Sequence, residues 1–201
     1  MDRIKEYSGA LTREQFLFYE IRIAAKLYLA GIDMHEAIKR IKEDNLFQFP
    51  TEREIASMAR VCYKRIKALD NELLIQELAE APVSIAKQIN LYAIMRSNGL
   101  VWDFMMQVVG EKYRNQDFSY EKKDLNVFFA NLQAQNDTVA SWSENTITKI
   151  KSVLTRMLVE AEYLESFRDK TLHPIYLSEE LETGIRANGD LDILPAFNCF
   201  L

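Results

Sequence analysis

Residues that interrupt helices are scarce in this chain, which contains six glycines and four prolines among 201 residues. Because both residue types break regular structure, their scarcity allows long, uninterrupted elements. Apolar side chains also recur every three or four residues through most of the sequence, as at Phe16, Tyr19, Ile23 and Leu27. This spacing places them on one face of a helix. The chain is therefore expected to be mainly α-helical.

Several helix starts carry a recognisable capping pattern. A Ser, Thr or Asp is followed three residues later by Glu or Gln, so that side chains can satisfy the free backbone N–H groups of the first turn. The pattern occurs at Thr12–Gln15, Asp33–Glu36, Thr51–Glu54 and Ser141–Glu144. It predicts helices that begin at these points, including one that runs from Thr51 to about Leu69.

Turn signals divide the predicted helices into three parts, residues 1–70, 71–98 and 99–201. The first part reads as three helices joined by short turns, a pattern typical of helix-turn-helix domains. The second part supplies connecting helices, and the third reads as another three-helix unit. Near its end, short apolar segments and the Asn188–Gly189 turn signal predict a small β-wing. The expected fold is two helix-turn-helix-like units packed together, the second of the winged-helix kind.

Composition and charge narrow the class of protein. With 48% hydrophobic and 27% charged residues, the chain has the make-up of a folded globular protein. Its net charge is −5, so any nucleic-acid function must rest on local basic surfaces. The N-terminus is charged from Asp2, unlike a secretory signal, and no apolar run approaches the roughly 18 residues of a membrane helix. We expect a cytoplasmic protein that has no membrane partner.

Motifs for catalysis, metals and cofactors are missing from the sequence. Neither His35 nor His173 has a partner at metal-ligand spacing, and Cys62 and Cys199 are too far apart for a paired-cysteine motif. No glycine-rich phosphate loop or nucleophile motif occurs. We therefore expect no enzyme activity, no metal, no cofactor and no small-molecule substrate.

The predicted helix from Thr51 to Leu69 has a basic face. Arg53, Arg60, Lys64 and Lys67 fall within a span of about 60° on a helical wheel. The apolar residues of this helix lie on the opposite side. The helix contains five basic residues, Arg65 included, against two acidic ones. It is also third in its unit, the position from which helix-turn-helix proteins contact DNA.

The helix predicted after Ser141 has a second polar face. Asn145, Lys149, Ser152 and Arg156 also span about 60° on a helical wheel. Short amide and hydroxyl side chains approach phosphates or base edges closely, while Lys and Arg supply charge. Arg168 and Lys170 follow, where a winged-helix protein would carry its wing. Each face also fits an ordinary solvated helix surface.

Three segments together resemble a known family. YSGALTREQFLFYEIRIAAKLYLAGIDMHEA near the start, RVCYKRIKALDNELL in the first part and TKIKSVLTRMLVEAEYLE in the last are similar to the BrxA family of BREX bacteriophage-exclusion systems. The resemblance extends over essentially the whole chain. It implies an all-helical cytoplasmic protein that works beside other BREX components, and it implies double-stranded DNA binding through helix-turn-helix and winged-helix elements.

These observations lead to one main hypothesis and two alternatives. The main hypothesis is a non-enzymatic double-stranded DNA-binding accessory of a BREX phage-defence system, in which both basic faces contact phosphates. The first alternative is a protein–protein adaptor for other BREX subunits, because residues 178–192 contain five acidic side chains against Arg186 alone. The second is an RNA-binding, antitermination-like protein.

Overall fold

The computed structural model describes residues 7–200 and is built from helices. Within that range it contains no β-strand, and a single isolated antiparallel bridge joins Ser119 to Thr171. The mainly α fold is therefore confirmed. No helix in the described range combines the length and the apolar composition that crossing a membrane requires.

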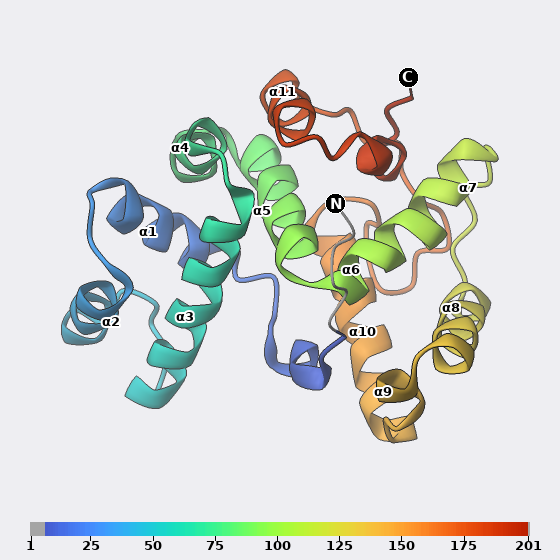
Figure 1. Cartoon of the computed structure of the whole chain (residues 1–201), viewed down its shortest axis with the longest axis horizontal. Coiled ribbons are helices and arrows are strands. Elements are labelled where there is room, and N and C mark those ends of the chain that lie inside the picture. Colours follow the sequence, from blue (N-terminus) through green and yellow to red (C-terminus); the bar gives the residue numbers. More distant parts are fainter. Residues whose placement is uncertain (1–6, 201) are drawn as a thin grey trace. The chain divides into compact units, whose positions relative to one another are not determined.

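Most helices follow one another with short connections, and the longest connection is residues 161–178 between α10 and α11 (Figure 1). In chain order they are η1 (Gly9–Arg13), α1 (Phe18–Leu29), α2 (Met34–Glu43), α3 (Glu52–Leu69), α4 (Glu72–Glu80), α5 (Val83–Ser97), α6 (Gly99–Phe104), η2 (Met105–Gly110), α7 (Glu111–Arg114), α8 (Lys122–Gln135), α9 (Asp137–Ala140), α10 (Glu144–Glu160), α11 (Glu179–Ala187) and η3 (Leu191–Phe197).

The described residues form two compact units. The α3 unit contains residues 16–97 and 178–184, and the α10 unit contains residues 7–15, 98–177 and 185–200. The division into domains 1–70, 71–98 and 99–201 stays a prediction.

Helix α3 is the centre of the α3 unit and packs against α1, α2 and α5 (Figure 1). It begins as predicted, because the Thr51 hydroxyl oxygen accepts a hydrogen bond from the Glu54 backbone N–H at 3.2 Å. Its apolar face, which includes Cys62 and Ile66, is fully buried. Burial of this stripe is the main force that holds the helix in place.

Arg65 is the one basic residue of this helix that lies outside the predicted basic face. Its side chain is 1% exposed, and its Nη1 donates a 3.0 Å hydrogen bond to the Phe16 carbonyl. The Asn90 side-chain amide donates to the same oxygen at 2.8 Å. A buried carbonyl needs such donors, so Arg65 serves the core and contributes nothing to the basic face.

The capping pattern at Thr12 does not start a helix, and this prediction was wrong. Residues 9–13 form a short 3₁₀ turn, and α1 begins only at Phe18. Between them Leu17 adopts a left-handed backbone conformation with φ of 54°. Phe16 and Leu17 are both buried, so tertiary packing outweighs the local helix signal.

The α10 unit begins with a continuous helical stretch, α6, η2 and α7, whose middle segment Met105–Gly110 is a π-helix. This segment packs against η3. A side chain at Gly110 would place its Cβ 3.3 Å from the Ala196 backbone nitrogen, so glycine permits the close approach. Helices α8, α9 and α10 complete the unit.

Two local predictions for this part of the chain need correction. The cap of α10 is Ser143, whose hydroxyl accepts from the Thr146 N–H, whereas the Ser141 hydroxyl donates to the Thr138 carbonyl. The predicted β-wing near the C-terminus is not present as strands among the described residues. Leu191–Phe197 forms the 3₁₀ helix η3, whose Ile193, Leu194 and Phe197 are completely buried.

Candidate nucleic-acid interface

The α3 stripe consists of Arg53, Arg60, Lys64 and Lys67, and all four side chains are exposed. Among the described residues none of them forms an ion pair. The buried face opposite orients the helix and fixes which side faces solvent. Four cations are therefore free to contact an anionic partner.

The polar face of α10 also lies at the surface, since Asn145, Lys149, Ser152 and Arg156 are exposed. The Arg156 guanidinium lies 5.4 Å from the centre of the Phe167 ring, within the range of a cation–π contact. The Ser152 hydroxyl donates to the Thr148 carbonyl one turn earlier and keeps its lone pairs available.

A concave surface of the α10 unit lies between α8 and α10 and is lined at one side by residues 167–170 of the loop that follows α10. This surface, the α8–α10 hollow, has a volume of about 990 Å³. Of the predicted site residues, Ser152, Arg168 and Lys170 line it, whereas Asn145, Lys149 and Arg156 do not. A second hollow of about 370 Å³ continues along the same two helices.

The hollow is strongly cationic. Five basic and two acidic side chains line it, the basic ones being Lys122, Lys123, Lys151, Arg168 and Lys170. Because an excess of one sign of charge in a concave, low-dielectric surface strengthens the local field, such a surface attracts anions even in an acidic protein.

Three of these cations, Lys122, Lys123 and Lys151, were not among the predicted site residues. Lys151 lies across α10 from Lys149, on the side that faces α8. Its ammonium donates to the Asn126 side-chain oxygen at 2.8 Å and lies 5.4 Å from the Phe129 ring centre. The pair Lys122–Lys123 at the start of α8 was a visible signal in the sequence, but only the fold brings it beside α10.

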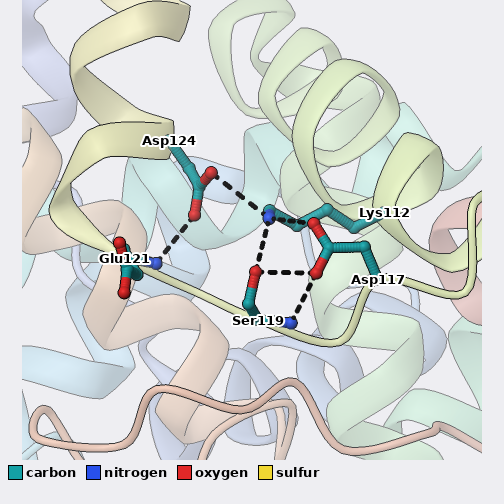
Figure 2. Close-up of polar contacts among 5 residues, drawn as sticks. All are labelled: Lys112, Asp117, Ser119, Glu121 and Asp124. Atoms are coloured by element: carbon teal, nitrogen blue, oxygen red, sulfur yellow. Dashed lines mark hydrogen bonds and ion pairs between the residues drawn. The ribbon is translucent and has the colours of Figure 1, made fainter.

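The start of α8 is held by a polar cluster around Lys112. Figure 2 shows the Lys112 ammonium between the carboxylates of Asp117 and Asp124, at 2.9 and 3.2 Å, with the Ser119 hydroxyl at 3.3 Å. The Glu121 N–H donates to Asp124 at 2.7 Å. Partial burial disfavours the charge of Lys112, but the two carboxylates outweigh this and raise its pKa. The cluster fixes the turn that leads to Lys122 and Lys123.

The 165–171 loop is attached to the same turn. The Tyr120 N–H donates to the Lys170 carbonyl and the Leu172 N–H to the Phe118 carbonyl, both at 2.7 Å. These two bonds form the isolated bridge noted above. They hold the loop against the segment before α8, so the cations on the two segments occupy fixed positions around the hollow.

Asp169 organises the loop from within. Its carboxylate accepts from the backbone N–H groups of Glu165 and Thr171, both at 3.0 Å, and contacts His173 Nε2 at 2.9 Å. The Glu165 N–H, the His173 ring and the Thr171 N–H together lower the pKa of Asp169 to about 2. Asp169 therefore stays ionised and keeps the loop ordered.

Glu165, Asp169 and His173 place one potential ligand atom each within 4.8 Å of one another. The expectation that His173 has no partner at metal-ligand spacing overlooked this cluster, whose residues recur at every fourth position of a loop. Asp169 is already committed to backbone N–H groups and to the histidine. The arrangement is accounted for by loop structure.

Comparison with the sequences of known proteins points to one family. The BrxA family model matches residues 5–189. A BREX protein BrxA from Bacillus cereus (strain H3081.97) is 32% identical over 94% of this chain and 96% of its own length. A BREX protein BrxA from Escherichia coli O9:H4 (strain HS) is 24% identical over 94% and 89%.

A crystal structure of an uncharacterised protein from Magnetospirillum magneticum has a TM-score of 0.80. It is 20% identical and covers 95% of this chain and 97% of its own, which shows a shared fold. The family match and the Bacillus cereus relative both extend over nearly the whole sequence. The chain therefore belongs to the BrxA family.

Proposed function

We propose that this protein is a non-enzymatic, double-stranded DNA-binding accessory of a BREX phage-defence system that works in the cytoplasm. The observation that carries the proposal is the pairing of two exposed basic surfaces, the α3 stripe and the α8–α10 hollow, in a chain of net charge −5. Basic surfaces on a protein whose net charge is negative favour a partner that carries closely spaced negative charges. The phosphate backbone of DNA is such a partner.

The order of elements supports duplex binding. In winged-helix proteins a short extended segment precedes the second helix and pairs with the wing that follows the third, recognition helix. Here the Ser119–Thr171 bridge has the same place relative to α8 and α10. In the α3 unit, α3 is the third helix, packed against α1 and α2. We therefore propose that both helices approach the major groove as recognition helices do.

A mobility-shift titration with duplex DNA at low salt tests the proposal. The double variant Arg60→Glu, Lys64→Glu should lower affinity at least about tenfold, because hydrogen bonds to charged groups are worth about 1.5–3 kcal/mol each. The control is Lys39→Glu, a similar reversal on α2 outside the stripe, which should bind like the parent. Unchanged affinity in the stripe variant would rule out the α3 contact.

Salt dependence gives a second measurement on the same protein. Phosphate-driven binding to duplex weakens with added salt with a slope of about −0.9 per contact in a log–log plot. Each neutral substitution in a contacting Lys should reduce the slope by about one. A slope near zero would contradict the phosphate mode.

An adaptor role is the second candidate. Glu179 and Glu180 are exposed at the start of α11, an acidic surface that repels DNA and suits a basic protein partner such as another BREX subunit. Co-purification of BREX subunits with a variant that no longer binds DNA would favour this function. Competition of structured RNA against duplex DNA separates the antitermination-like alternative.

A further inference from the structure

Phe167 is an exposed aromatic residue within a basic surface. Its side chain is 52% exposed and it lines the α8–α10 hollow. The Arg156 guanidinium lies 5.4 Å from the ring centre, and Arg156 is not among the residues that line the hollow. The ring therefore contacts a cation and also borders the space between α8 and α10. An aromatic surface in this position is suited to stacking against a nucleobase.

The other walls carry the polar groups that a base edge requires. Asn126, Thr148 and Ser152 line the hollow from α8 and α10. The Asn126 oxygen accepts from Lys151, which fixes the amide and leaves its NH₂ group as a donor. Amide and hydroxyl groups are side chains that form hydrogen bonds with base edges.

Cations surround this combination of groups. Lys122 and Lys123 are on the α8 side, and Arg168 and Lys170 are on the loop beside Phe167. The volume of about 990 Å³ is typical of pockets for small organic molecules. A duplex, whose major groove alone is about 12 Å wide, is too large to enter a space of this volume.

We propose that the α8–α10 hollow binds an unpaired nucleotide of a DNA strand, with the base against Phe167 and the neighbouring phosphates against Lys122, Lys123 and Lys170. This inference rests on the proposed DNA-binding function and refines its substrate to duplex that carries an unpaired or displaced segment. Blunt duplex would contact exposed cations such as those of the α3 stripe without entering the hollow. An overhang would also fill the hollow.

The test compares a blunt duplex with the same duplex carrying a short single-stranded overhang, by fluorescence anisotropy with the full chain. The parent should bind the overhang substrate about tenfold more tightly, since stacking contributes about 1–3 kcal/mol per base. Phe167→Ala should lose this advantage and bind blunt duplex as before, whereas Phe167→Trp should retain it. Tyr19→Ala, which removes an exposed aromatic of α1 outside the hollow, is the matched control and should change neither affinity.

A 2-aminopurine in the overhang gives an independent readout. Its fluorescence should be quenched when the parent binds and should stay high with Phe167→Ala. Equal affinity of the parent for both substrates, or equal loss on both in Phe167→Ala, would overturn the nucleotide site and leave duplex binding intact. Binding of the overhang strand without any binding of blunt duplex would support the hollow and contradict the proposed duplex function.

Discussion

The α3 stripe and the α8–α10 hollow are both basic, but they are built differently. The stripe has four cations on one face of one helix, and Glu52 and Glu54 lie at the start of the same helix. The hollow has five cations from the start of α8, the middle of α10 and a loop, with an aromatic ring and an amide between them. A single helix face can offer charge at regular spacing. A surface assembled from three segments can also enclose part of a ligand.

This difference predicts unequal losses on charge reversal. Arg168→Glu with Lys170→Glu should weaken binding of duplex that carries an overhang about 100-fold, because each residue shares a concave field with other cations and each contact is worth about tenfold. Arg60→Glu with Lys64→Glu should cost nearer tenfold. Anisotropy titrations at one low salt concentration measure both. A larger loss in the stripe variant would reverse the assignment of the principal site.

A core variant in the α3 unit separates stability from binding. A Cβ at Gly184 would lie 2.5 Å from the Leu74 side chain, so Gly184→Ala overpacks the contact between α11 and α4. We expect a loss of about 1–3 kcal/mol in the free energy of unfolding. DNA affinity at a temperature where the protein remains folded should be unchanged, since the α3 stripe is untouched. Chemical denaturation and anisotropy of the same sample check both expectations.

Lys112 gives a test of the scaffold beneath the hollow. Its side chain is 12% exposed and does not line the hollow, yet it joins Asp117 to Asp124 (Figure 2). Lys112→Met should destabilise the protein by about 1–2 kcal/mol, because two carboxylates lose their hydrogen-bond partner. It should weaken overhang binding severalfold with little effect on blunt duplex. If both substrates respond alike, the cluster does not position the hollow in particular.

The smallest expected effect is a pH dependence at Asp169. Its pKa is about 2 in the folded protein and near 3.8 in the unfolded chain. A carboxyl with a lowered folded pKa stabilises the fold above the unfolded value and loses that contribution as pH falls from about 4 toward about 2. The melting temperatures of the parent and Asp169→Asn should therefore differ most near neutral pH and converge in this acid range. A constant difference would show that the carboxylate charge is not involved.

The sequence by itself determined the helical class, the limits of α3 and the exposure of its stripe. These follow from local capping and from burial of one apolar face, which act over neighbouring residues. Its helix signal at Thr12 was overridden because Phe16 and Leu17 are needed in the core. Arg65 also lies in the core, where its guanidinium donates to the Phe16 carbonyl.

Only the tertiary structure decided the composition of the hollow. Lys122, Lys151 and Phe167 are far apart in the sequence, and no helical period relates them. The bridge at Ser119 and the Asp169 carboxylate bring their segments together through backbone hydrogen bonds, whose partners a residue pattern does not identify. A basic stripe on one helix is local and can be read along the chain. A basic hollow depends on how three segments pack together. Its residues therefore cannot be identified from the spacing along any one segment.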